Sequence, residues 1–414
     1  MVNRQDRAEP TPSAPITEVQ SSGAPPDGGY GWVCVGAQFF INGFTWGVAA
    51  AYGIYLSHYL SHDLFPDARP LDYAFIGGFN FAFALLVAGP ATVMTRLYGV
   101  HAPMCIGVVL MPAGFFGASF ATKVWHLYLS QGLAVGLGIG LIYIPATAVI
   151  SQWFSHKRSF ANGICAAGSG VGGLVIIFFT QKALDDLGVA WSLRITAIVT
   201  LVVNSVATLL VRSRNKQIQP DLRMFNVRIL RSYHARLLLG WSFTIMFGYI
   251  NLMFSLSDYA QIIGRSANDA AVVQALLNLG TAIGRPAINY ASDHWGRIEV
   301  AGLSTVLCAV LIFGLWASTT TYAALLVFSI LSGAVLGIFW VVIGPLATEI
   351  VGLKQLPAML SITWLTLVIP SAALALRHPE IGLRSYLYAQ VFAGVAYTGC
   401  KWPGASDTSS MRNG

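Results

Sequence analysis

The sequence predicts an all-α, polytopic membrane protein with about twelve transmembrane helices in two six-helix halves. Long apolar segments recur from Trp32 almost to the C-terminus, and each approaches the roughly 20 helical residues that cross a ~30 Å hydrocarbon core. Hydrophobic residues make up 55% of the chain and charged residues only 10%, whereas soluble domains carry about 25% charge. Lipid is therefore the expected solvent of this chain.

Apolar segments and polar connections give the expected organisation. The first six spans form an N-terminal half at 30–211, and the last six form a C-terminal half at 235–400, in which the final helix is short. A linker at 212–234 separates the halves, and polar tails occupy 1–29 and 401–414. The N-terminal tail lacks the apolar core of a cleavable signal peptide and has a disordered composition, so the first helix is expected to direct insertion. The expected spans are 31–57, 72–97, 102–122, 125–151, 159–181, 190–211, 236–257, 268–292, 299–317, 321–348, 355–376 and 385–400.

The net charge of +7 comes mainly from Lys and Arg in the expected connections. Positively charged loops remain on the cytoplasmic side of a membrane, so the pattern indicates cytoplasmic termini and an even number of spans. Binding of anionic lipid headgroups is an alternative role for the basic linker. The chain has no basic, aromatic-interleaved domain outside the membrane, which argues against nucleic acid as a partner. The basic residues of the linker are Arg212, Arg214, Lys216, Arg223, Arg228 and Arg231.

Metal, disulfide and catalytic sites are not expected. The five cysteines show no metal-ligand spacing and lie in or beside apolar segments, where they serve as small hydrophobic residues. Motifs for a nucleophile elbow, a zinc protease, a phosphate-binding loop or a dinucleotide site are absent from the sequence. We therefore expect no cofactor, no enzymatic activity and no ATP-driven step within this chain.

A faint internal repeat relates the two halves. The fourth span contains Ile-Pro-Ala-Thr at 144–147, and the tenth contains Gly-Pro-Leu-Ala-Thr at 344–348. The ends of the second and eighth spans are similar in the same way, with an arginine and a glycine in the loop that follows. Related patterns six helices apart are typical of transporters built from two structural repeats.

The loop after the eighth span carries a candidate latch. Asp293, Gly296 and Arg297 combine a carboxylate, a residue suited to a tight turn, and a cation, and Lys157 and Arg158 precede the fifth span. Such groups at helix ends can hold one conformation of a transporter closed through ion pairs and helix dipoles. An ordinary loop with solvated charges is the alternative.

Arg285 is the most informative single charge because it lies inside the eighth span, about two turns from its end. A guanidinium within a membrane normally faces a cavity or a partner, and Pro286 beside it can kink the helix. Two roles remain open. Arg285 either binds an anionic substrate, or it is a structural arginine that is tied to main-chain carbonyls or reaches the membrane interface.

Other polar and aromatic residues recur on the remaining spans. Each one alone is more typical of helix packing than of ligand contact, but as a set they would line a central cavity for an aromatic or carboxylated molecule. The candidates are Asn42, Trp46, Asn80, Tyr143, Asn251, Asn278 and Trp340.

The most specific motif precedes the first span and consists of Asp27, Gly28, Gly29, Tyr30, Gly31 and Trp32. It resembles the signature of the monocarboxylate transporter family of the major facilitator superfamily. The loop at 153–163 and the pair Arg285-Pro286 resemble the same family, and the segments 256–260 and 278–282 are most similar to its fungal branch. On physical grounds, the glycines permit a tight helix entry, and Asp27 suits the positive end of the first helix dipole.

This resemblance implies the major facilitator fold and a transporter that works by alternating access around a midplane cavity. It implies that Arg285 recognises the anion. Animal lactate carriers of the family have a lysine in the first helix and an aspartate one turn before the arginine, where this chain has Ala50 or its neighbour and Thr281. Proton–lactate symport is therefore not the expected activity, although protons remain a candidate coupling ion.

We expect a secondary active or facilitative porter for a monocarboxylate, a related organic anion, or a riboflavin-like or secondary metabolite. The alternative is a membrane sensor or scaffold that keeps a transporter fold without moving solute. The expected setting is a monomer in the plasma membrane, with a vacuolar or other organelle membrane as the alternative.

Overall fold

The computed structural model describes residues 25–61, 64–65, 68–218, 226–316 and 321–369, and its regular structure there is helical, without strands. The N-terminal half begins with α1 (Gly31–Ala50) and α2 (Tyr52–Ser61). It continues with α3 (Pro70–Leu86), α4 (Ala88–Tyr98), α5 (His101–Ala118), α6 (Val124–Leu127), the π-helical η1 (Tyr128–Ala134), α7 (Val135–Trp153) and α8 (Arg158–Leu210).

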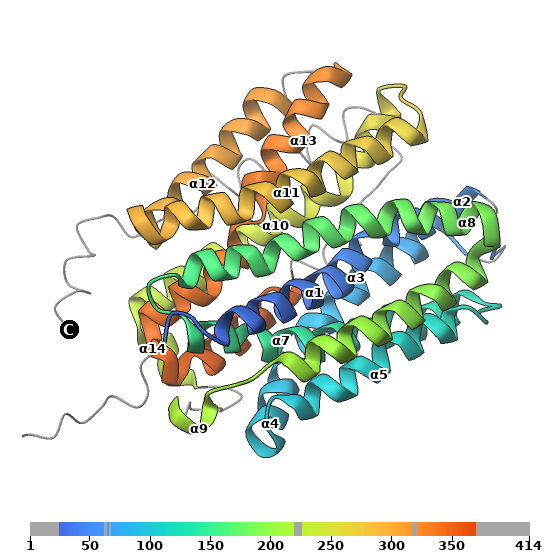
Figure 1. The fold of residues 1–414 in the computed structure, drawn as a ribbon. Coiled ribbons are helices and arrows are strands. Elements are labelled where there is room, and N and C mark those ends of the chain that lie inside the picture. Colours follow the sequence, from blue (N-terminus) through green and yellow to red (C-terminus); the bar gives the residue numbers. More distant parts are fainter. Residues whose placement is uncertain (1–24, 62–63, 66–67, 219–225, 317–320, 370–414) are drawn as a thin grey trace, which may run out of the picture.

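The C-terminal half follows the short α9 (Asn215–Ile218) and the 3-10 helix η2 (Val227–Arg231). Its elements are α10 (Tyr233–Ile262), α11 (Ala267–Trp295), α12 (Arg297–Leu311), the π-helical η3 (Ile312–Trp316), α13 (Tyr322–Leu336) and α14 (Ile338–Thr366). Figure 1 shows α11, α12 and α13 on one side of the N-terminal part of α8, with α1, α3, α5, α7 and the C-terminal part of α8 on the other.

Two glycines turn continuous helices back on themselves. Gly188 has φ 76° within α8 and Gly352 has φ 72° within α14, a left-handed backbone that glycine adopts without a Cβ penalty. The 53 residues of α8 would extend ~80 Å as a straight helix, far more than one membrane crossing needs. The turn at Gly188 therefore separates two crossings, as the expected spans 159–181 and 190–211 require.

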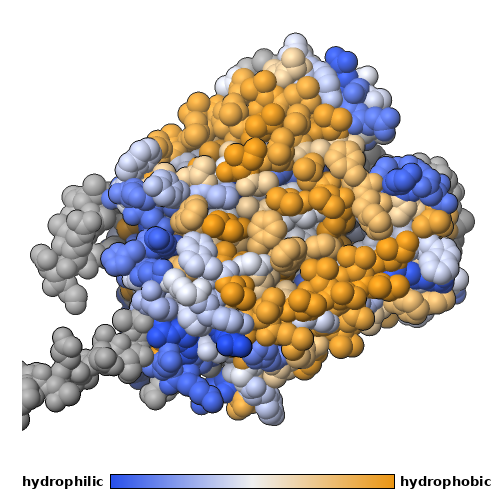
Figure 2. Space-filling model, in the orientation of Figure 1, coloured by the Kyte–Doolittle hydropathy of each residue, from blue (hydrophilic) through white to orange (hydrophobic). Residues whose placement is uncertain are grey.

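Seven helical runs of the described residues are long and apolar enough to cross a membrane, and the runs Arg158–Leu210 and Tyr322–Thr366 contain these two turns. Each expected span up to 355–376 corresponds to a helical run over its described residues. The expected last span, 385–400, lies outside them. Figure 2 shows hydrophobic side chains in a broad band across the bundle and hydrophilic side chains towards its two ends, as a lipid-facing surface requires.

Helix α8 is the element through which the halves meet most closely. It packs extensively against α1 of its own half and against α11 of the other half. A Cβ at Gly163 would lie 2.8 Å from the main-chain oxygen of Arg285, and one at Gly170 would lie 2.6 Å from that of Asn278. These glycines let the backbones of α8 and α11 approach, as small residues do in membrane helix pairs, and they bring Arg285 against α8.

Candidate functional site

A cavity lies between the halves, and the space among its lining atoms is about 640 Å³ when open solvent is counted. Helices of both halves contribute to its wall. Both halves supply aromatic side chains, the N-terminal half supplies Asn42 and Ser169, and α11 supplies most of the remaining polar groups. The lining residues are Asn42, Trp46, Ala50, Phe81, Tyr143, Ser169, Tyr249, Met253, Leu277, Asn278, Thr281, Arg285, Leu336, Gly337 and Trp340.

Arg285 reaches this cavity from α11 and is anchored to α8. Its side chain is 6% exposed, and Nη1 donates hydrogen bonds to the main-chain oxygen of Ala166 at 3.1 Å and to Ser169 Oγ at 2.8 Å. The guanidinium lies directly against Gly337, where a Cβ would collide with it. Arg285 Nε has no hydrogen-bond partner among the described residues. Arg285 is thus tied to a carbonyl, as the structural alternative expects, and it also lines the cavity, where its recognition of an anion stays a prediction.

The charge of Arg285 is uncompensated within the wall. Among the described lining residues it is the one charged side chain, and none of them is Asp or Glu. Position 281, one turn before it, is a threonine whose hydroxyl donates to the main-chain oxygen of Gly333 at 3.1 Å. An anion in the cavity would therefore meet a buried cation without competition from a neighbouring carboxylate.

The structure brings together most of the binding residues predicted from sequence. Trp46 lies 5.5 Å from Tyr143 and 5.3 Å from Trp340 between ring centroids, so residues of three helices meet. The indole Nε1 of Trp46 and the amide Nδ2 of Asn278 are buried and have no hydrogen-bond partner among the described residues. Asn42 also lines the cavity, although its amide donates to Gln38 in its own helix.

One predicted residue lies outside this group, and the structure does not describe the side chain of another. Asn80 donates from Nδ2 to the main-chain oxygen of Gln131 at 2.8 Å and so pairs α3 with η1. Asn251 lies on α10, and its side chain is outside the part of the chain that the structure describes. Sequence reasoning missed Ser169 and Tyr249, and the Gly-Ser-Gly step at 168–170 was a usable signal for Ser169 because a hydroxyl there adjoins the closest helix contact.

The predicted latch residues form a polar lock at one end of the bundle, made by Asp293, Arg297, Ser155, Ser159, Phe160 and Glu349. Asp293 at the end of α11 accepts hydrogen bonds from the main-chain N–H groups of Ser159 at 3.0 Å and Phe160 at 2.8 Å, in the first turn of α8. Because a helix N-terminus carries partial positive charge, this carboxylate joins the halves through both charge and hydrogen bonds.

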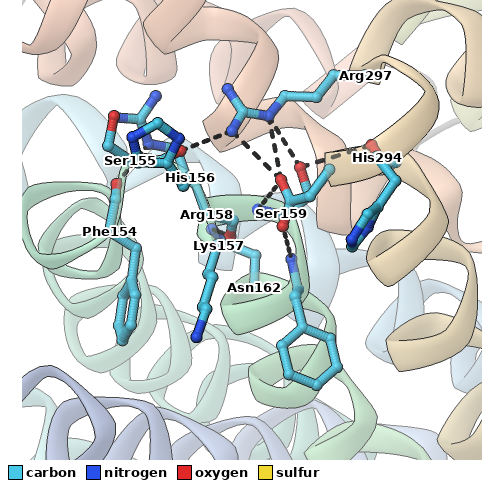
Figure 3. A network of polar contacts seen from close by, with 12 residues as sticks. Phe154, Ser155, His156, Lys157, Arg158, Ser159, Asn162, His294 and Arg297 are labelled. Carbon is cyan, nitrogen blue, oxygen red and sulfur yellow. Dashed lines mark hydrogen bonds and ion pairs between the residues drawn. The ribbon is translucent and has the colours of Figure 1, made fainter. Parts of the chain in front are cut away.

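Arg297 completes the polar lock (Figure 3). Its guanidinium lies 3.3 Å from Asp293, donates to the main-chain oxygen of Ser155 at 2.8 Å and pairs with Glu349 at 2.6 Å. Gly296 has φ 109°, and a Cβ there would collide with Glu299. Only glycine suits this turn, which directs Arg297 back across Asp293.

Lys157 and Arg158 contribute differently from each other. The Arg158 side chain is buried and donates from Nε to the main-chain oxygen of Phe154 at 2.9 Å, so it shapes the turn into α8. The exposed Lys157 takes part through its main-chain N–H, which lies 3.4 Å from Asp27 Oδ1.

The motif before α1 folds against the same turn. Asp27 Oδ1 accepts hydrogen bonds from the N–H groups of Ser155 at 2.6 Å and His156 at 2.9 Å, while the Asp27 N–H donates to Trp153. Asp27 therefore caps the turn before α8 rather than the first helix that the sequence suggested. Gly28 and Gly29 make the bend, and Gly29 has φ 59°.

Gly31 and Trp32 complete this contact. A Cβ at Gly31 would lie 3.0 Å from the side chains of Trp153 and Phe154, so glycine permits the close approach. The Trp32 ring packs edge-on against Phe154 with ring centroids 4.9 Å apart. The motif at 27–32 and the loop at 153–163, which are far apart in sequence, therefore pack together as one structural unit.

Comparison with known proteins places this fold. The family model described as Major Facilitator Superfamily matches residues 35–249 and 237–375. Probable transporter MCH2 of Saccharomyces cerevisiae is 32% identical over 390 residues, covering 91% of this chain and 82% of that protein. Monocarboxylate transporter 11 of Homo sapiens is 28% identical over 320 residues, covering 75% of this chain and 66% of that protein.

Among solved structures, the proton:xylose symporter XylE bound to 6-bromo-6-deoxy-D-glucose has a similar fold. Its TM-score is 0.69 at 12% identity, and the match covers 90% of this chain and 94% of that one. The expected all-α major facilitator fold and the resemblance to monocarboxylate transporter-like proteins are confirmed. The chain belongs to the Major Facilitator Superfamily and transports solute across a membrane.

Proposed function

We propose that this chain transports a small organic anion bearing a carboxylate, by alternating access, and that Arg285 holds the carboxylate. The observation that carries the proposal is a buried guanidinium that lines the cavity, is anchored by Nη1 to α8, and has no hydrogen-bond partner at Nε among the described residues. A buried, unpaired cation is costly in a membrane protein. A carboxylate relieves that cost through charge-assisted hydrogen bonds.

Alternating access is supported by the way the halves are joined at one end. The polar lock ties α8 to α11, and Thr92 on α4 shares a 2.7 Å hydrogen bond with Ser361 on α14. Both connections would have to break before the cavity opened at this end. We place this end in the cytoplasm, because the basic linker begins beside it at Arg212. The expected setting remains a monomer in the plasma membrane.

A proton-coupled carrier needs a group that binds the proton, and the described wall of the cavity contains no carboxylate. We therefore propose that the anion moves without a proton carrier in the wall, as facilitated diffusion or exchange. The test is uptake of radiolabelled monocarboxylates into proteoliposomes that contain the purified chain, with and without an inward proton gradient. Uptake at equal rates under both conditions is expected, whereas accumulation only with the gradient would overturn the uncoupled proposal.

The role of Arg285 is tested with Arg285→Gln in the same vesicles. This variant should lose at least about tenfold in uptake, because one charge-assisted contact contributes roughly 1.5–3 kcal/mol. Arg194→Gln is the matched control, since Arg194 lies over Phe120 and Trp191 outside the described cavity wall. Unchanged uptake in Arg285→Gln would refute the carboxylate site. Binding without flux in the unaltered protein would instead favour the sensor alternative.

A further inference from the structure

The cavity wall is aromatic on both sides of the boundary between the halves. Trp46 and Tyr143 come from the N-terminal half, and Tyr249 and Trp340 come from the C-terminal half. The rings contact one another directly across the boundary, with Trp46 and Trp340 centroids 5.3 Å apart. A continuous aromatic surface therefore faces the same space as the Arg285 guanidinium.

This surface is held rigidly from behind. The Trp340 ring stacks on Trp364 at 5.5 Å with an angle of 18° between planes, and Trp364 is fully buried. Tyr249 and Phe339 pack edge-on against Trp340 at 6.1 Å and 5.3 Å. Because the Trp340 plane is fixed before any ligand arrives, a planar ring could stack against it at little cost in side-chain ordering.

The wall also offers hydrogen-bond donors that nothing in the described chain satisfies. Trp46 Nε1 and Asn278 Nδ2 are buried without partners, as is Arg285 Nε. A buried donor without a partner costs free energy, so its presence in a cavity wall points to an absent ligand or water. The three donors come from both halves and lie in the same wall as the aromatic rings.

From this arrangement, and resting on the proposed anion function, we infer that the substrate is a planar aromatic or conjugated carboxylate. Arg285 binds the carboxylate, and Trp340 with Trp46 contacts the ring. Trp340 is then a specificity-determining residue that favours flat rings over aliphatic bodies of the same size. Aromatic rings interact favourably with one another beyond the area they bury, in stacked or edge-on geometry.

The test uses three probes that differ in one property each. Benzoate and cyclohexanecarboxylate share a carboxylate and a six-membered ring but differ in planarity, while benzamide keeps the flat ring and lacks the charge. Binding is measured by calorimetry on the purified full chain in lipid nanodiscs. Benzoate should bind about tenfold more tightly than cyclohexanecarboxylate, and benzamide should bind weakly.

Variants assign the preference to Trp340. Trp340→Leu should bring the two acids to nearly equal affinity, and Trp340→Phe should retain most of the preference because it keeps a ring. Arg285→Gln should weaken both acids by the same factor. Trp125→Leu is the matched control, since Trp125 is exposed and outside the described cavity wall, and it should leave all affinities unchanged.

The outcomes separate this inference from the proposed function. Equal binding of the two acids, with benzamide weak, would overturn the aromatic preference and leave the carboxylate site standing. Equal binding of benzoate and benzamide, both tighter than cyclohexanecarboxylate, would overturn the carboxylate site and leave the aromatic preference. Binding of none of the probes to folded protein would overturn both, and a preference that survives in Trp340→Leu would refute the role of that residue.

Discussion

Asp27 and Asp293 come from opposite halves of the protein and cap the same helix entry. Asp27 accepts from the N–H groups of Ser155 and His156, and Asp293 accepts from those of Ser159 and Phe160 at the start of α8. Two carboxylates thus share one positive helix end. The Asp27 contact lies within the N-terminal half, whereas the Asp293 contact crosses between the halves.

Asp293→Asn should weaken the polar lock, because the amide keeps the shape of the carboxylate and loses its charge towards Arg297 and the α8 dipole. We expect the lock to open about tenfold more often, since such charge contacts contribute roughly 1–2 kcal/mol. The measurement is the labelling rate of a cysteine introduced at Ser151, which is fully buried near this end. Cys105, which is exposed, is first replaced by serine.

The control for this measurement is Asp185→Asn, because Asp185 contacts Gln181 within α8 and is exposed. Its labelling rate should equal that of the parent. Identical labelling in Asp293→Asn and the parent would remove Asp293 from any gating role.

Asp27→Ala should lower stability without abolishing the contact between the halves. Loss of a capping side chain costs about 0.5–2 kcal/mol, and here at least two main-chain N–H groups lose their acceptor. The melting temperature in detergent should fall by several degrees, and Asp186→Ala should leave it unchanged because Asp186 forms an exposed ion pair with Lys182. An unaltered melting temperature would mean that the Asp27 side chain does not contribute to the stability of the protein.

Gly337→Ala should impair binding although it replaces no charged residue. A Cβ at Gly337 collides with the Arg285 guanidinium, so the side chain must shift away from Ala166 and Ser169. We expect carboxylate affinity to fall by about tenfold, the scale of one displaced charge-assisted bond. Gly36→Ala is the matched control, because nothing lies within 4 Å of a Cβ there. Equal affinity in both variants would show that the Arg285 position does not matter for binding.

The hydrogen bond between Thr92 and Ser361 should contribute about 1 kcal/mol to the closed arrangement, as is usual for a buried neutral pair. Thr92→Val and Ser361→Ala should each raise labelling of the Ser151 cysteine severalfold. The double variant should add little more, because either change alone removes the same bond. Fully additive effects would indicate that the two hydroxyls act independently.

Sequence patterns anticipate the helices better than the contacts between them. Spans are visible because apolar runs of membrane length are rare in other proteins. Arg285 and Trp340 are expected at one cavity because polar and aromatic residues recur on several spans. Asn80 illustrates the limit of that reasoning, since its amide satisfies the Gln131 carbonyl and only the packing of α3 against η1 reveals it.

Asp27 shows a second limit. Its position just before α1 suggested the dipole of that helix, but it accepts from N–H groups more than a hundred residues away. The local sequence around a loop does not predict which distant helix end the loop will contact. Ser169 was missed for a related reason, because its importance depends on the register between α8 and α11.

The first four turns of α8 hold both the polar lock and the Arg285 anchor. The N–H groups of Ser159 and Phe160 donate hydrogen bonds to Asp293. A few residues further on, the Ala166 carbonyl and the Ser169 hydroxyl accept hydrogen bonds from the Arg285 guanidinium. Under the proposed function, a carboxylate at Nε would bind the same guanidinium whose Nη1 joins α11 to α8, close to the polar lock. Binding of the substrate and separation of α8 from α11 would then be linked through one side chain, so substrate would change the rate at which the carrier moves between its two orientations.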